Sequence, residues 1–270
     1  MAQPMGSATL MFPYLDVTTV QAAGTSPFFG GVVMNWTEEA QTRTETEPVF
    51  KQIDIIAYEL SGYSKISNAL MADSAIGLDA LLMSLFGRAI SWYEDYAFLR
   101  GNGAGKPLGA ISWPGFVSVT RSGANAFVLA DFAGVLGRWL QNYDGSASCW
   151  VCHPTVLVKL FQLASTLGQL IFIDNVREKP RMMLAGLPLV VSEKVPALGT
   201  AGDIGVYDWS KYIIGDRQQI EIAFSEHYAF VNNQGVWRFV SRVGGKPWMT
   251  DKVTLSDATN SLSPFVGLAA

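Results

Sequence analysis

The chain has 270 residues, of which 49% are hydrophobic and only 16% are charged, against roughly 25% charged residues in typical soluble domains. Its 19 basic and 23 acidic residues leave a net charge of −4, which excludes the basic surface of a dedicated nucleic-acid-binding protein. With 15 Phe, 9 Tyr and 8 Trp, the chain has more large apolar surface than a charge-poor monomer hides easily, so we expect part of it to contact other subunits.

We expect neither an export signal nor a membrane span in the N-terminal region. No basic residue precedes Arg43, so the positively charged start of a signal peptide is missing. Residues 17–37 are uncharged and long enough to cross a membrane, but Gln21, Pro27 and Asn35 interrupt them, which excludes that interpretation. The two cysteines are too few for a disulfide framework.

The first 60 residues are expected to be extended. Residues 1–35 contain three prolines and no helical or alternating period, which predicts an arm that docks elsewhere. From Trp36 the chain becomes strand-like, passes through the polar residues 42–47 and returns through residues 49–60. This pattern predicts a long two-stranded excursion with a charged tip.

A long amphipathic helix follows. Apolar residues recur at positions i, i+3, i+4 and i+7 from Leu78 to Leu99, Ser74 can cap the start, and Gly101 supplies the stop. A helix of about 26 residues is roughly 39 Å long. The polar residues on its other side are Asp79, Ser84, Arg88, Ser91 and Asp95.

After this helix, short strands and helices alternate. Asp131 is expected to cap a second helix, residues 148–152 form a strand, and Pro154 occupies the first turn of a third helix. Further strands are expected at residues 187–192, 204–207, 218–224 and 236–243. The second half of the chain is therefore a mixed α/β unit.

Two motifs superficially suggest cofactor chemistry. Residues 101–107 resemble a phosphate-binding loop, but the glycine spacing is one residue short and Pro107 replaces the required hydroxyl. Cys149 and Cys152 followed by His153 match a haem-attachment pattern. Residues three apart on a strand point to opposite faces, so we expect the two thiols to diverge, buried and idle.

No catalytic or metal-binding group is expected either. His153 and His227 are the only histidines, which leaves a zinc site without enough ligands. The adjacent acids Glu38/Glu39 and Glu94/Asp95 diverge too much for paired acid–base work. We therefore predict no catalytic residue, no cofactor-binding residue and no metal ligand.

Four stretches together carry a resemblance to a known family. They are Ser67-x-x-Leu70-x-x-Asp73-Ser74; Glu94-Asp95-x-x-Phe98-Leu99-x-Gly101-x-Gly103-x-x-Lys106-Pro107-x-Gly109; Leu184-x-Gly186-Leu187-Pro188-Leu189-Val190; and Phe230-Val231-Asn232-Asn233 with Arg238-Phe239-x-x-Arg242. In order and spacing, over about residues 30–245, the chain resembles the major capsid proteins of tailed bacteriophages, which have the Hong Kong ninety-seven-like fold.

The resemblance implies an α+β subunit in four parts. These are an N-terminal arm (1–30), an extended β-hairpin loop (31–62), a peripheral domain with the long spine helix (63–109 and 217–250), and an axial α/β domain (110–216 and 251–270). It implies self-assembly into hexamers and pentamers that close an icosahedral shell around double-stranded DNA, without sequence-specific binding, catalysis, cofactors or a membrane. Scaffold, portal and decoration proteins are the implied partners, and the implied location is the virion after assembly in the host cytoplasm.

The chain departs from the family pattern in two ways. Some members join subunits by an isopeptide bond between a loop lysine and a peripheral-domain asparagine, assisted by a glutamate. Here Asn232 and Asn233 match, but the loop tip has Arg43 and no lysine, and the glutamate position falls near Val240. The chain also starts at the arm, so we expect either a processed form or a separate or absent scaffold.

Two alternatives remain open from the sequence. Encapsulin nanocompartments share the fold and a similar length, and the sequence does not separate a cargo compartment firmly from a DNA-filled head. A soluble oligomeric α/β enzyme is the alternative of a different class.

Overall fold

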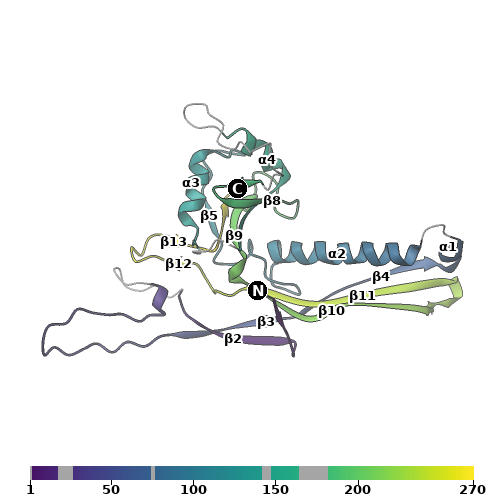
Figure 1. Ribbon diagram of the computed structural model, residues 1–270, viewed down its shortest axis with the longest axis horizontal. Helices are drawn as coiled ribbons and strands as arrows, with labels where there is room; N and C mark the ends of the chain where they lie inside the picture. The colour runs from purple at the N-terminus through teal and green to yellow at the C-terminus, as the bar shows by residue number, and fades with distance from the viewer. Residues whose placement is uncertain (1, 18–26, 74–76, 142–146, 164–181) are drawn as a thin grey trace.

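The computed structural model describes residues 2–17, 27–73, 77–141, 147–163 and 182–270. An elongated sheet with one long helix extends from a compact α/β body, and an N-terminal ribbon and loop project the other way (Figure 1). No helix among these residues is long and apolar enough to cross a membrane.

The elongated, peripheral sheet has four strands in the order β1-β10-β11-β4. A long antiparallel hairpin at its centre is formed by β10 (Tyr212–Ala229) and β11 (Gln234–Pro247). The turn of this hairpin is η3 (Phe230–Asn232), followed by Asn233 in the left-handed conformation, which Asn tolerates better than most residues. The flanking strands are β4 (Tyr58–Ser67), antiparallel to β11, and β1 (Ala2–Pro4), parallel to β10.

One face of this sheet is covered by the predicted helix, α2 (Leu78–Arg100). Phe86 stacks on Phe239 of β11 with their ring centroids 3.6 Å apart, and Ile90 is buried beside them. The start differs from the expectation, because Gly77 holds the N-cap position without a side-chain cap and Ser74 lies outside the described residues. Before it comes the short helix α1 (Asn68–Asp73).

The helix ends at Gly101, as predicted, and the chain then folds back on it. The last carbonyl groups of a helix lack partners within the helix. Here the backbone N–H of Ala110 donates to the carbonyl of Phe98 at 2.9 Å, and that of Ile111 donates to the carbonyl of Leu99 at 3.0 Å. A Cβ at Gly101 would lie 2.0 Å from the carbonyl oxygen of Pro107. Residues 101–107 are thus a closely packed helix exit.

The compact, axial body is built on a six-stranded sheet. Its strands run in the order β5 (Val117–Val119), β14 (Phe265–Leu268), β9 (Ile204–Asp208), β6 (Ser148–Cys152), β8 (Leu187–Val191) and β7 (Met183–Leu184). Helices α3 (Leu129–Arg138) and α4 (Pro154–Phe161) pack on one face through buried Val135, Val156 and Leu160. The strands expected here and the start of α4 at Pro154 are confirmed.

The prediction that Asp131 is the N-cap residue of α3 is wrong. Val128 holds the N-cap of α3, and Asp131 lies three residues later, in the first turn. Its carboxylate accepts hydrogen bonds from the backbone N–H of Val128 at 3.0 Å and of Ser122 at 2.8 Å. The bond from the N-cap amide of Val128 to the carboxylate at the third helical position is the pattern of a capping box.

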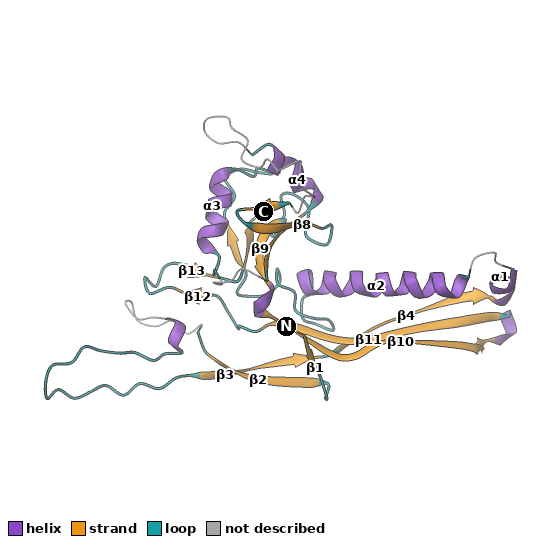
Figure 2. Cartoon of the chain, viewed as in Figure 1, coloured by secondary structure: helices purple, strands orange, loops and turns teal. Residues whose placement is uncertain are grey.

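The prediction for the first 60 residues needs a larger correction. The N-terminal arm is not free of secondary structure, because β2 (Thr9–Leu15) pairs antiparallel with β3 (Phe50–Ile56). The two-stranded excursion therefore joins the arm to the return limb, and residues 33–49 between them form a projecting loop with no strand (Figure 2). The remaining described elements are η1 (Pro27–Phe29), η2 (Trp209–Lys211), β12 (Val253–Thr254) and β13 (Ser261–Leu262).

Replacing Gly101 with alanine tests the close packing at the helix exit. The new Cβ would meet backbone atoms that cannot rotate away, so we expect a loss of about 1–3 kcal/mol in unfolding free energy. Gly87→Ala is the matched control, because a Cβ there meets nothing within 4 Å and should stabilise the helix by about 0.5–1 kcal/mol. Urea denaturation followed by circular dichroism measures both. Equal effects in the two variants would contradict the structure at this turn.

Candidate subunit interface

The projecting loop is anchored firmly at its base. Buried Asp16 forms an ion pair with Lys51 at 2.8 Å, and its backbone N–H donates to the carbonyl of Val49. The hydrogen bond of Asp16 raises the pKa of the Lys51 ammonium group, and so does its charge. Tyr14 donates to the hydroxyl of Thr250 at 2.9 Å, which ties the ribbon to the segment after β11.

Beyond this base, the loop has almost no internal support. Within residues 34–45 the backbone–backbone hydrogen bonding of the structure consists of one contact, from Gln41 to Glu38. The side chains of Met34 and Trp36 are 86% and 105% exposed. Four acidic residues, Glu38, Glu39, Glu45 and Glu47, outnumber the single base Arg43 in residues 33–49. A loop that exposes large apolar side chains and carries several carboxylates becomes stable only when another surface covers it.

The far end of the peripheral sheet is a second exposed apolar region. At the β10–β11 turn, Phe230 is 78% exposed and Val231 97% exposed. Nearby, the Lys65 ammonium lies 5.3 Å from the ring centroid of Tyr228, a cation–π distance. Asn233 accepts a hydrogen bond from the amide of Asn68, so the turn is held to the helical end of the sheet.

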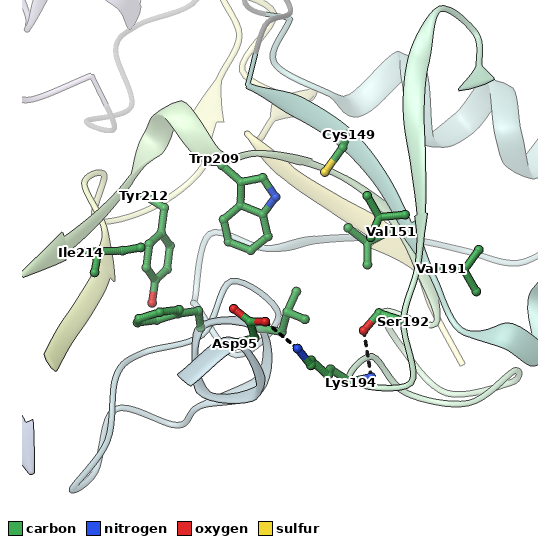
Figure 3. A pocket seen from close by; sticks show the side chains of 12 residues that line it. Asp95, Cys149, Val151, Val191, Ser192, Lys194, Trp209, Tyr212 and Ile214 are labelled. Carbon is green, nitrogen blue, oxygen red and sulfur yellow. Dashed lines mark hydrogen bonds and ion pairs between the residues drawn. The ribbon is translucent and has the colours of Figure 1, made fainter. Parts of the chain in front are cut away.

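A cavity of about 540 Å³ lies where the spine helix meets the axial body (Figure 3). The last turn of α2, strands β6 and β8, and the segment from η2 into β10 surround it. Asp95 and Lys194 form an ion pair at its rim, and the Ser192 hydroxyl accepts from the Lys194 backbone N–H. Its apolar wall includes Phe98, Leu99, Val151, Val191, Trp209 and Tyr212.

The acid pairs do not assemble a catalytic site. Glu94 faces the sheet, where Ser241 donates to its carboxylate at 3.2 Å. Burial raises the pKa of Glu94 above its ordinary value, and the Ser241 bond offsets part of this rise. Asp95 points instead to Lys194. The second pair, Glu38 and Glu39, is exposed in the projecting loop.

The two cysteines occupy opposite faces of the axial sheet, as predicted. Cys152 packs in the core beneath α3 and α4, whereas Cys149 packs on the other face and lines the cavity. Both thiols are free, and burial raises both pKa values, that of Cys152 to about 12. His153 caps α4, since its Nδ1 accepts from the Thr155 backbone N–H. Among the described residues no group of three His, Cys, Asp or Glu side chains could hold a metal ion.

Sequence reasoning missed the most deeply buried of the described ion pairs and the cavity. Arg121 and Asp203 are buried in the axial body and lie 2.6 Å apart. Arg121 also donates to the carbonyls of Ala126 and Ala269, which satisfies much of its buried charge. No local pattern marks these residues, because their partners lie up to 148 positions away.

Comparisons with known proteins place the chain among capsid proteins. The sequence profile described as "Phage capsid family" matches residues 3–255. The major capsid protein of Klebsiella oxytoca phage phiKO2 is 26% identical over 220 residues, covering 76% of this chain and 50% of that protein. The chain therefore spans about half the length of this curated relative.

Solved structures agree on the fold. The capsid of a native GTA particle aligns with a TM-score of 0.75 at 18% identity, covering 100% of this chain and 88% of that chain. Microbacterium phage Oxtober96 aligns with a TM-score of 0.69 at 16% identity, also covering 100% and 88%. These alignments confirm the predicted α+β, Hong Kong ninety-seven-like fold.

The two thiols give a test of the axial sheet, because Cys152 is buried as predicted whereas Cys149 is only half-buried. Only the thiolate reacts with maleimide, and a raised pKa keeps the thiol protonated. At about pH 8, near the pKa of a free thiol, we expect Cys152 to resist N-ethylmaleimide and Cys149 to react slowly. Both should react rapidly in urea, as followed by mass spectrometry. Fast labelling of Cys152 in the native protein would contradict its burial.

Proposed function

The chain belongs to the phage capsid family, and from this premise we propose that it is a major capsid protein whose copies assemble into five- and six-membered rings. These rings would close an icosahedral shell around double-stranded DNA. The observation that carries the proposal is the projecting loop, residues 33–49, which extends from an anchored base and carries fully exposed Trp36.

The physical support is that the subunit exposes large apolar side chains that its own segments do not cover. Exposed large apolar side chains lie in the loop, at the β10–β11 turn and on α2, where Leu81, Met83 and Leu85 are exposed. Burying apolar surface contributes about 25 cal/mol per Å². Copies that cover these regions for each other therefore gain stability that a single subunit does not have.

We propose the four-part division stated above for the assembled subunit: arm 1–30, extended loop 31–62, peripheral domain 63–109 and 217–250, and axial domain 110–216 and 251–270. Scaffold, portal and decoration proteins are the proposed partners, with assembly in the host cytoplasm and a final place in the virion. The net charge of −4 fits a shell that encloses DNA without gripping it. A purely structural role agrees with the arrangement of the acids and cysteines described above.

The relatives favour a phage head over the encapsulin alternative. The matching family profile and the curated relative are both phage capsid proteins. The soluble α/β enzyme is disfavoured on a separate ground, because Glu94 and Asp95 face different partners.

Electron microscopy of the purified protein tests shell formation directly. We expect large, uniform closed particles from the wild-type chain. Replacing residues 42–47 with Asn-Gly removes the hydrogen bonds of the Thr46 hydroxyl to Val33 and Gly31 but no helix or strand. It should therefore leave the far-ultraviolet circular dichroism unchanged but impair assembly or lower the melting temperature of the shell. Single exposed ion pairs are worth only about 0–1 kcal/mol, but a shell repeats each one at every subunit. Sedimentation showing only small oligomers under all assembly conditions would refute the proposal.

We further propose that mature particles are held without covalent links. The projecting loop contains no lysine, and Lys51 at its base is engaged by Asp16. Val240 stands where an assisting glutamate is expected; the nearest one in register is Glu221 on β10, whose carboxylate lies 3.8 Å from the Arg238 guanidinium. Boiling particles in detergent should release single chains of 29.3 kDa. A ladder of covalent oligomers on the gel would refute the proposal.

A further inference from the structure

Trp36 is a large apolar side chain with no surface to cover it. It is fully exposed, and the loop that carries it extends away from the axial body in its own subunit (Figure 1). Few backbone hydrogen bonds restrain this part of the loop. An aromatic anchor presented in this way is typical of a side chain that inserts into a pocket of a partner.

The cavity between α2 and the axial body has the properties of such a pocket. Its volume is about 540 Å³, whereas a cavity of about 150 Å³ already accepts benzene, so an indole ring fits with room for its backbone. Trp209 and Tyr212 provide aromatic walls (Figure 3), and Phe98 lines the cavity as well. Aromatic rings pack favourably against one another in stacked or edge-to-face arrangements.

The rim of the cavity also matches the polar part of the indole. A buried indole N–H requires an acceptor. The Asp95 carboxylate and the Ser192 hydroxyl both lie at the rim, and a carboxylate that binds one ammonium retains free lone pairs.

Charged groups of both signs lie near the rim of the cavity. Glu38 and Glu39 follow Trp36 by two and three residues, within the acidic loop. Lys194 lies at the rim, and exposed Arg88 precedes Asp95 by two helical turns on the same side of α2. Lys194 is already paired with Asp95 and follows Glu193 in the chain, so Arg88 is the basic group that the loop carboxylates would approach when Trp36 is seated.

We propose that the Trp36 side chain of one copy inserts into the junction cavity of a neighbouring copy, between the last turn of α2 and strands β6 and β8. This inference rests on the proposed assembly, and names the surface that receives the loop. The occupant is a second copy, because the loop of the same subunit points away from its own cavity.

Chemical cross-linking tests this contact, because Cys149 already lines the cavity. Trp36→Cys shells are treated with a short bismaleimide at mildly alkaline pH, since burial raises the pKa of the Cys149 thiol. Denaturing gels should then show covalent oligomers as the main product. Trp36→Cys/Cys149→Ala is the matched control and should remain monomeric, as should Thr44→Cys, which places the thiol near the loop tip.

The outcomes separate this inference from the assembly proposal. Well-formed Trp36→Cys shells that give no cross-link, or that cross-link equally without Cys149, would overturn the docking site while leaving the shell function intact. If wild-type protein forms no shells, the proposed function itself fails.

A second set of variants covers the case in which Trp36→Cys does not assemble. Val191→Trp fills the cavity from its own wall, so it should lower the melting temperature of shells as Trp36→Ala does. The double variant should lose little more than either single variant, because both remove the same contact. Val158→Trp, on the exposed side of α4 and outside the cavity, should leave shell melting unchanged. Additive losses from Trp36→Ala and Val191→Trp would show that the two residues act at different places and would refute the inference.

Discussion

The position of the peripheral half of the subunit relative to the axial half depends on the backbone hydrogen bonds that close the last turn of α2. The amides of Ala110 and Ile111 satisfy carbonyl groups of the spine helix, and the chain then continues directly into the axial body through buried Trp113. Hydrogen bonds between backbone atoms leave little freedom for rotation, and the tight approach at Gly101 admits no side chain. The long peripheral sheet is therefore held at a defined angle to the axial sheet.

The elongated peripheral sheet leaves apolar surface that neighbouring copies can cover. A four-stranded sheet covered by one helix buries one of its faces, as the stacking of Phe86 on Phe239 shows, while the opposite face carries exposed Tyr63 and Tyr228. An elongated shape also has much surface for its volume, so a smaller share of the chain's apolar surface can be buried internally. A compact chain of the same composition would bury more of its apolar surface internally and would gain less free energy from assembly. Shape and self-association are thus consequences of the same arrangement.

Local patterns predicted many elements well and their pairing poorly. The apolar period from Leu78 to Leu99 predicted α2, and Pro154 marked the start of α4, because helix periodicity and end signals are local. The predicted partner of β3 was wrong. The segment after Trp36 was expected to be the second strand, because its residues are typical of a strand and it is adjacent to β3 in sequence. The actual partner, β2, lies upstream of the loop, and nothing in either segment encodes that choice.

The sequence by itself determined the spine helix and its glycine stop, and the divergence of Cys149 and Cys152, because each follows from spacing along a single element. The α+β class followed from the family resemblance. Only the tertiary structure decided which apolar residues stay uncovered. Trp36 and Phe12 are both aromatic residues of the N-terminal ribbon and its loop, but Trp36 is fully exposed while Phe12 packs in a small core. Exposure is the outcome of contacts among distant segments, and the junction cavity likewise exists only where α2, β6, β8 and β10 come together.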